Sequence, residues 1–573
     1  MSWVKNNWLI LLVLAIGFLL RFVPLFEYEY FYDELTAIDR IRYTNLSDII
    51  NNGVVPDVHP AFIQVFLYYW AKIGGTSEVW IKLPFLACGF LSCWFLFLFS
   101  KKWFGYKTGV IAAIVISCSM IFLVYSSSNH LYATAVLFSV LATYYLFEIT
   151  FGNSIQLKHY ILFGLFVLLG ALNHHMGALY GLIIGALGVV FSQKKQRNFL
   201  LLSAIVILLF YAPNLSITLK QMSYSIGPDQ GGWLTAPKWY ACFSFLKTLF
   251  GTGWVIYFFI SLFLFSSIKN RFGFIKDKKI IFLFTTFLTY CLIVHFYSIL
   301  KSPILQFSVL LIAAPCIIIV MAKGLSLIPD KFFNTVSIIL IIVFLIQTIY
   351  VKQYYSLGIK QGNRSAVVQT IEAKNKYGTD KVTAIYATEA FFVTHYMDEF
   401  KNHFTYLTSA DSIYNNQVLL GRYLKSLKEN YILLSDPDAI LLERTKIYFP
   451  YLIYHDEGYF KDIFLLSKTN TNSIKDETIL GEFKPDRSST SFNFPEKYAT
   501  ENNNILIDST NEFPFYVWAD FNSLHFTLGQ VVICSSVFKP QNEMRNLTFD
   551  FNIKKNDSSL FYANRNFKDF YLS

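Results

Sequence analysis

Four acidic side chains lie within the first eight positions of the stretch EYEYFYDELTAID (27–39), directly after the first long apolar run of the chain: Glu27, Glu29, Asp33 and Glu34. A carboxylate in such a place has one obvious chemical use, which is to take a proton from a hydroxyl group of a substrate. The alternative is a solvated acidic loop without a chemical role. The residues alone leave both interpretations open.

Histidines supply a second set of candidates. Asp57 and His59, in PDVHP, are candidate substrate contacts and candidate ligands of a divalent cation, but two residues are too few to specify a metal. The alternative is that His59-Pro60 simply begins a helix, because proline is favoured in a first turn. His174 and His175 are candidates for phosphate or metal, or ordinary polar residues at a membrane surface.

The composition places these residues in a membrane protein. The chain has 573 residues, of which 54% are hydrophobic and only 15% charged. These values are outside the range of soluble globular proteins. The net charge of +10 does not indicate a nucleic-acid partner, because lysine and arginine occur in short clusters between apolar runs. Six cysteines lie in apolar segments, which leaves Cys534 without a disulfide partner in the polar C-terminal part.

Membrane spans and their orientation follow from the apolar runs and the basic loops. The first run is expected to be a retained span, and the aromatic stretch 59–75 an amphipathic helix at the interface. The positive-inside rule places the N-terminus in the cytoplasm and YFYDEL outside, with five of the histidines near the outer side. About eleven runs approach the roughly 20 residues that cross a bilayer: 8–26, 79–100, 108–125, 131–150, 158–172, 175–191, 199–214, 241–267, 280–299, 303–322 and 332–351.

The composition changes beyond about residue 355. Strand-then-helix patterns predict a small extracytoplasmic α/β domain over 356–470, in which SDPDA (435–439) is a turn. Alternating stretches separated by Asn, Ser and Pro predict a β-sandwich-like domain over 471–573. The sequence thus predicts a helical polytopic membrane domain over 1–355 followed by two outer domains.

Three motifs resemble the start of the polytopic GT-C glycosyltransferases. They are Asp33-Glu34 in the first outer loop, His59-Pro60 before an aromatic helix, and Lys82-Leu83-Pro84 in the next span. Within this class the chain is similar to bacterial relatives of the protein O-mannosyltransferases, which use dolichyl-phosphate-mannose-type donors, and to the lipid A aminoarabinose transferase. Two family arginines are replaced, one by His130 and one within Gln306-Phe307.

This resemblance implies an enzyme of the cytoplasmic (inner) membrane with an extracytoplasmic active site. Its donor is a sugar linked to polyprenyl phosphate, and its acceptor is a hydroxyl of a lipid, a protein or a polysaccharide. Asp33 is the expected base, and Glu34 orients its loop or contacts substrate. The resemblance further suggests His130 as a substrate contact and three basic side chains as phosphate ligands, although each alternatively extends to the membrane surface: Arg21, Lys82 and Lys301.

Other functions compatible with the sequence are a transporter or flippase of lipid-linked sugars, and a polysaccharide polymerase or ligase. A transporter is expected to have interrupted helices and polar residues deep in the membrane, whereas here the polar residues gather at the outer ends. A polymerase or ligase is not expected to have the early Asp-Glu loop. A catalytically inactive relative, which has lost donor binding together with the two arginines, is the third alternative.

Overall fold

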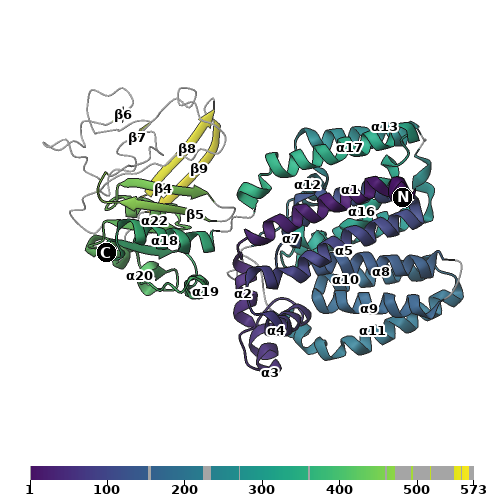
Figure 1. Ribbon diagram of the computed structural model, residues 1–573, viewed down its shortest axis with the longest axis horizontal. Coiled ribbons are helices and arrows are strands. Elements are labelled where there is room, and N and C mark those ends of the chain that lie inside the picture. Colours follow the sequence, from purple (N-terminus) through teal and green to yellow (C-terminus); the bar gives the residue numbers. More distant parts are fainter. Residues whose placement is uncertain are drawn as a thin grey trace. The chain divides into compact units, whose positions relative to one another are not determined.

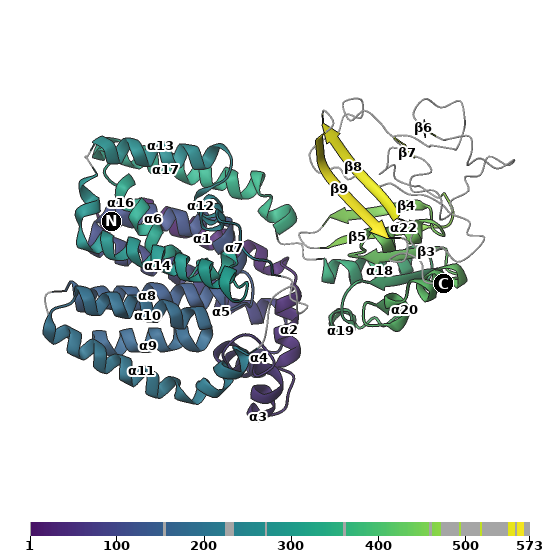
Figure 2. The ribbon, with the colours of Figure 1, turned by 180° about the vertical axis from the view of Figure 1, so that it is seen from behind.

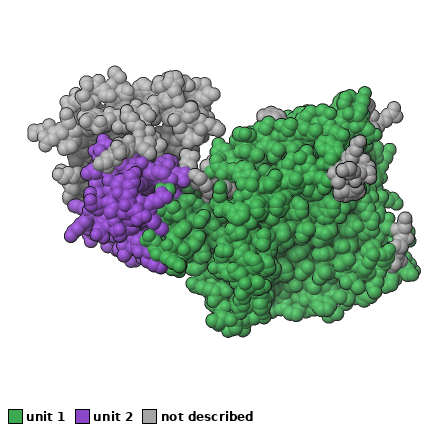
Figure 3. Space-filling model, viewed as in Figure 1, with its two compact units in different colours: residues 1–369, 391–402, 457–461 green, residues 370–390, 403–456, 462–573 purple. Residues whose placement is uncertain are grey.

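The computed structural model describes residues 2–152, 156–223, 234–269, 272–358, 362–457 and 461–470, and four strands farther along the chain. The chain forms two compact units (Figure 3). Unit 1 comprises residues 1–369, 391–402 and 457–461, and unit 2 comprises 370–390, 403–456 and 462–573. Unit 1 therefore extends past residue 355, where the sequence predicted the first domain to end, and it includes two later segments.

Unit 1 is a helical bundle (Figure 1), in which α8 and α10 both pack against α9. Helices α18 (Asn363–Tyr377) and α19 (Ala390–Phe400) cross the boundary between the units. The other helices of the bundle are α1 (Ser2–Phe22), α2 (Tyr32–Arg40), α3 (Leu46–Asp48), α4 (Phe62–Gly74), α5 (Glu78–Phe104), α6 (Tyr106–Cys118), α7 (Met120–Ser126), α8 (Tyr132–Thr150), α9 (Leu157–Asn173), α10 (His175–Phe191), α11 (Lys194–Gln221), α12 (Ala241–Phe250), α13 (Trp254–Lys269), α14 (Lys278–Leu300), α15 (Phe307–Leu310), α16 (Ala314–Leu325) and α17 (Asp330–Ile346).

The apolar helices make this chain an integral membrane protein. Within the described residues, six helices are long and apolar enough to cross a membrane, or up to eight if each of two bent pairs forms one span. Three further apolar helices, α9, α10 and α16, are shorter. The predicted number of eleven spans is therefore not confirmed. The long spans are Asn7–Phe26, Glu78–Phe104, Tyr132–Thr150, Lys194–Gln221, Lys278–Leu300 and Asp330–Ser356.

Three runs predicted as uninterrupted spans are broken. The run 108–125 is divided between α6 and α7, which meet at 63°, and the run 241–267 between α12 and α13, which meet at 88°. The run 303–322 contains α15 and α16, separated by a turn. Hydropathy detects apolar residues but does not detect a change of helix direction among them, which is why the sequence did not predict the breaks.

The break between α6 and α7 exposes backbone carbonyl groups that need donors inside the bundle. The Arg21 guanidinium donates to the carbonyl oxygens of Ile116 at 2.9 Å and Ser117 at 3.0 Å. Thr348 Oγ1 donates to the carbonyl oxygen of Cys118 at 2.7 Å. The buried arginine of α1 therefore stabilises the end of a neighbouring broken helix.

Unit 2 contains a five-stranded sheet with the order β2-β1-β3-β5-β4, of which β3, β4 and β5 are labelled in Figure 2. Strand β1 is parallel to β2 and β3, while β3 is antiparallel to β5. Both β1 and β3 are buried along their length, as parallel strands covered on both faces are. The strands are β1 (Val382–Tyr386), β2 (Leu407–Thr408), β3 (Tyr431–Ser435), β4 (Tyr451–Glu457) and β5 (Asp462–Ser467).

Helices α20 (Ser412–Asn415), α21 (Gln417–Ser426) and α22 (Ala439–Lys446) also belong to unit 2. Leu424 of α21 and Leu441 of α22 pack with Ile432 and Leu434 of β3 in one apolar core. The predicted turn at 435–439 connects β3 to α22, and Asp438 Oδ1 accepts the backbone N–H of Leu441 at 2.6 Å. This aspartate is therefore the N-cap of a helix.

The predicted β-sandwich over 471–573 lies outside the described residues except for four strands. Strands β6 (Phe492–Asn493) and β7 (Tyr516–Val517) form one antiparallel pair. Strands β8 (Thr548–Lys555) and β9 (Ser558–Asn566) form another.

Candidate active site

Helix α2 carries Asp33 and Glu34 in its first turn, and the two carboxylates have opposite environments. The side chain of Asp33 is 58% exposed, whereas that of Glu34 is completely buried. Phe31, the N-cap residue, has no side-chain acceptor, so Glu34 Oε2 accepts the Phe31 N–H at 3.1 Å. Glu34 Oε1 accepts the Asn129 N–H at 2.6 Å. Glu34 thus fixes α2 and connects it to the segment before α8.

Lys82 of α5 reaches the same buried region. Its Nζ donates to the Tyr28 carbonyl oxygen at 2.6 Å and lies 3.9 Å from Glu34 Oε2. The ammonium also lies over the rings of Tyr28 and Tyr30, at 4.4 and 4.6 Å from their centroids. Burial raises the pKa of Glu34 to about 7, although Lys82 and the two backbone N–H groups act in the opposite direction. Lys82 has no exposed surface through which it would contact a phosphate.

Three histidines from separate elements lie close together, and one of them lies beside Asp33. His130 Nε2 lies 3.7 Å from Asp33 Oδ2. The ring centroid of His59 lies 5.8 Å from that of His130 and 5.2 Å from that of His174. We call His59, His130 and His174 the histidine cluster. Residues 33, 59, 130 and 174 are distant in the sequence, so the fold brings four of the predicted site residues together.

Asp57 closes one side of the histidine cluster. Its Oδ2 forms an ion pair with Arg40 of α2 at 2.8 Å, and its Oδ1 lies 3.5 Å from His59 Nδ1. Burial alone would raise the pKa of Asp57, but His59 and Arg40 outweigh burial and hold this pKa below its usual value. Asp57 is therefore ionised at neutral pH.

Two members of the cluster, His130 and His174, are poor cations because burial lowers the pKa of each imidazole. Burial lowers the pKa of His130 to about 4, even though Asp33 acts in the opposite direction. His174 Nδ1 accepts the Met176 N–H at 2.9 Å, which leaves the ring proton of a neutral imidazole on Nε2. At neutral pH these two rings each offer one N–H donor, without a full charge.

The arrangement around Asp57 does not fit a metal ion. Both carboxylate oxygens already have partners, because Oδ1 also accepts the Val58 N–H at 2.8 Å. The Arg40 guanidinium beside Oδ2 repels a cation. No group of three or more His, Cys, Asp or Glu residues that could hold a metal occurs in the described part of the chain.

The remaining predicted site residues are His175, Lys301 and Arg21. His175 Nε2 is 2.9 Å from Gln221 Oε1, and Gln221 Nε2 donates to the His59 carbonyl oxygen at 2.7 Å. Lys301 is exposed, with its Nζ 5.8 Å from the centroid of the Tyr297 ring. Arg21 is buried and donates within the bundle, so its placement does not support the predicted role in phosphate binding.

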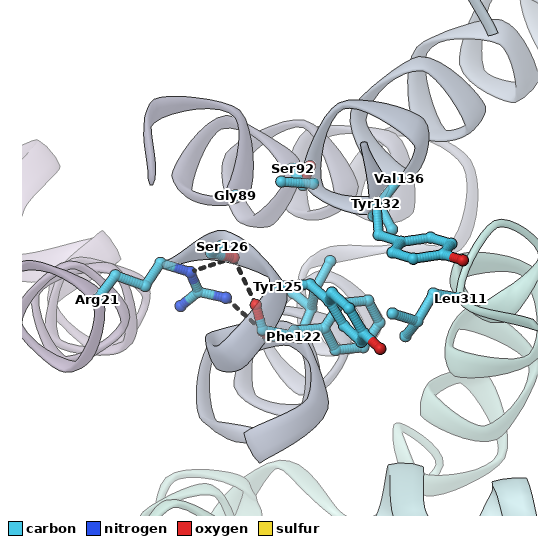
Figure 4. Close-up of a pocket in the computed structure, with 11 residues that line it drawn as sticks. Arg21, Gly89, Ser92, Phe122, Tyr125, Ser126, Tyr132, Val136 and Leu311 are labelled. Atoms are coloured by element: carbon cyan, nitrogen blue, oxygen red, sulfur yellow. Dashed lines mark hydrogen bonds between the residues drawn. The ribbon is translucent and has the colours of Figure 1, made fainter. Parts of the chain in front are cut away.

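A small pocket lies between Arg21 and Tyr132 (Figure 4). Arg21 and Ser126 line one end, where Arg21 Nε donates to Ser126 Oγ at 3.1 Å. The Tyr132 ring lines the other end and stacks on His130, with centroids 4.9 Å apart. Tyr132 therefore separates the pocket from the cluster.

Sequence reasoning missed several residues that shape this site, among them Arg40, Asn129, Tyr132 and Gln221. Arg40 carries a weak signal, because it follows Asp33 by two turns on one short helix. Asn129 acts through its backbone N–H, which any residue except proline provides. Its position therefore could not be predicted from residue type.

One protein-family model matches part of the helical bundle. Residues 58–217 match the family model described as dolichyl-phosphate-mannose-protein mannosyltransferase. This match confirms the resemblance predicted from the sequence. The matched range includes His59, Lys82, His130 and His174, whereas Asp33 lies before it. No curated protein sequence matches the chain.

Solved structures with some similarity to the chain include ArnT from Cupriavidus metallidurans in the apo state. The identity is 12% and the TM-score 0.49, with 80% of this chain and 98% of ArnT covered. ArnT bound to undecaprenyl phosphate has 12% identity, a TM-score of 0.42 and coverages of 82% and 99%. The apo oligosaccharyltransferase of Archaeoglobus fulgidus has 13% identity, a TM-score of 0.45 and coverages of 83% and 76%.

Proposed function

We propose that this protein is a membrane glycosyltransferase that moves a sugar from a polyprenyl-phosphate carrier to an acceptor hydroxyl. The proposal places the histidine cluster and Asp33 on the outer side of the cytoplasmic membrane, following the distribution of basic loops. The observation that carries the proposal is the gathering of Asp33 and three histidines beside each other, three of these residues lying in the segment that matches the mannosyltransferase family.

Asp33 has the role of general base in this reaction. It is the exposed member of the acidic pair, so an acceptor hydroxyl can reach its carboxylate. The acceptor O–H proton passes to Asp33 as the acceptor oxygen forms a bond to C1 of the sugar. The bond between C1 and the phosphate oxygen breaks, and its electron pair leaves with the polyprenyl phosphate.

The departing phosphate needs hydrogen-bond donors where its charge develops. We assign this role to the N–H groups of the histidine cluster, with the charge of Arg40 nearby. Lys82 and Arg21 are enclosed in the bundle, so we leave them out of this step. Because His130 replaces a family arginine, the hydrogen-bond donor to the phosphate at this position is a neutral group and not a charged one.

The test is sugar transfer by the full chain in liposomes, using a panel of polyprenyl-phosphate sugars and acceptors of the lipid, peptide and polysaccharide classes. The variants are Asp33→Asn and, as a matched control, Glu27→Gln, which changes an exposed carboxylate of the same stretch. We expect transfer by the parent and by Glu27→Gln but not by Asp33→Asn. Equal transfer by Asp33→Asn and the parent would contradict the role of Asp33.

A transporter of lipid-linked sugars is the second candidate, and the two bent helix pairs favour it. Interrupted helices are a feature of transporters, and α6–α7 and α12–α13 bend by 63° and 88°. The same liposomes distinguish the two functions. Movement of the intact donor across the bilayer without any acceptor supports the transporter, whereas a glycosylated acceptor supports the enzyme.

A further inference from the structure

The segment that precedes α2 is held by residues from much later in the chain. Glu29 is 5% exposed, and its Oε2 accepts the Arg364 N–H at 3.0 Å, while the Ser365 hydroxyl donates to Oε1. Both partners lie in the first turn of α18, which begins at Asn363. The N–H groups of a first helical turn have no partner within the helix and favour an anion. Glu29 supplies that anion from a distance of more than 300 residues along the chain.

Tyr30 lies two residues before α2, and its backbone forms hydrogen bonds with residues of α5, α18 and α19. Its N–H is shared between Glu78 Oε1 at 3.1 Å and the Tyr396 hydroxyl at 3.2 Å. The Tyr396 hydroxyl in turn donates to Glu78 Oε1 at 2.8 Å. The Tyr30 carbonyl oxygen accepts from Asn363 Nδ2 at 3.2 Å. Tyr30 and Tyr396 are fully buried, so water does not compete for these bonds.

A side chain at the start of α2 and another just after its end pack on the start of α19. The rings of Tyr32 and Phe392 meet edge to face with centroids 4.9 Å apart. The Arg42 guanidinium lies 5.5 Å from the centroid of the Phe391 ring. The whole of α2, and Asp33 with it, is therefore supported from one side by residues that follow the membrane-spanning helices in the sequence.

We propose that residues 363–365 and 391–399, the docking segments, position Asp33 for proton transfer, with Glu29 and Tyr396 as the positioning residues. This inference rests on the proposed function, because it assigns a purpose to the placement of Asp33. It implies that the membrane helices alone do not form a competent site, since part of the support for α2 comes from the docking segments. A general base must be held close to the acceptor proton, and small displacements reduce the rate strongly.

The docking itself is tested by hydrogen exchange of the full chain in lipid nanodiscs, with the variants Glu29→Gln and Tyr396→Phe. Each removes a bond to a charged group, so we expect the amides of α2 to exchange at least about ten-fold faster. Glu27→Gln serves as the matched control, because Glu27 lies in the same stretch but is exposed. Unchanged exchange in both test variants would overturn the proposal. Thermal unfolding of each variant shows whether the change is confined to this region.

Kinetics test the purpose of the docking. In a purely structural role, Tyr396→Phe would lower the amount of folded enzyme but leave kcat per folded molecule unchanged. In a positioning role we expect kcat to fall by about ten- to one hundred-fold, with little change in KM, because Tyr396 does not touch substrate. Faster exchange with an unchanged kcat would overturn the positioning role. Failure of the parent to transfer any sugar would overturn the proposed function and the positioning role together, while leaving the exchange result on docking intact.

Discussion

Asp33 and Glu34 are neighbours on one helical turn, but their environments differ. Glu34 points into the bundle, where it accepts two backbone N–H groups and lies near Lys82. Asp33 points outward and faces His130. Successive residues of a helix are separated by about 100°, which lets one turn serve both sides. A pair of adjacent acids in a membrane protein can thus divide into a buried structural member and an exposed member that a substrate can reach.

The same division holds for the cations predicted to bind phosphate. Arg21 and Lys82 donate to backbone carbonyl oxygens in the interior, whereas Lys301 is exposed. Inside a membrane, carbonyl groups without donors are costly. A basic side chain in a span therefore has a structural use that competes with any role in binding substrate.

Lys82→Met gives the largest effect that we expect on the inward side of α2. It leaves Glu34 buried without its cationic neighbour, and breaking a buried pair in this way costs about 3–5 kcal/mol of unfolding free energy. Asp33→Asn should change the unfolding free energy by less than about 0.5 kcal/mol, because its side chain is mostly exposed. Unfolding in a denaturant series in mixed micelles measures both. Equal losses in the two variants would remove the distinction between the inward and outward acids.

Arg21→Leu tests the structural role of Arg21, which donates hydrogen bonds inside the bundle. Two carbonyl groups at the end of α6 and one in α1 lose their side-chain donor, at about 1–3 kcal/mol for each group that stays unsatisfied. We expect a loss of about 3 kcal/mol in unfolding free energy after relaxation. A stable Arg21→Leu variant that has lost binding of polyprenyl phosphate would instead assign Arg21 to the substrate.

The stability of the protein should depend on pH through Glu34. Its pKa is raised from 4.5 to about 7, so the folded state binds the proton more tightly than the unfolded state. The stabilisation from this group is complete below about pH 4.5 and is lost as the pH rises through about 7, by up to about 3 kcal/mol in total. Melting temperatures between these pH values measure this effect, and Glu34→Gln should remove its share of the slope. A slope of the opposite sign that disappears in Glu34→Gln would show that the carboxylate is stabilised in its ionised form.

Lys301→Ala is expected to have the smallest effect. The side chain is exposed, so the unfolding free energy should change by less than about 0.5 kcal/mol. Transfer should also stay within about two-fold of the parent, since screened surface charges contribute little. A large loss of transfer with normal stability would return Lys301 to the donor site.

The sequence predicted the classes of structure better than the contacts. Apolar runs identified the membrane helices, because burial in lipid imposes length and composition on each span. Residue types near the ends of these helices also indicated His59, His130 and His174, which the fold brings together. The bends in 108–125 and 241–267 were not predicted, since hydropathy carries no direction.

The contacts that hold α2 in place could not be predicted from the sequence either. Glu29 has its partners, Arg364 and Ser365, more than 300 residues away along the chain, so no local pattern predicts its role. Arg21 and Lys82 were predicted to bind phosphate as charged side chains. In the structure they donate to backbone carbonyl oxygens, which every residue has. Long-range contacts to backbone groups therefore cannot be predicted from residue types.

The most direct measurement of the central claim is the rate of sugar transfer per folded molecule for Asp33→Asn and Glu27→Gln, compared side by side in liposomes with the donor that the parent uses. We expect Asp33→Asn to lose about 10²- to 10⁴-fold in rate, the range of a general base, while Glu27→Gln keeps the rate of the parent. Transfer by folded Asp33→Asn at the rate of the parent would contradict the account, because the outward acid of α2 would then have no part in the chemistry.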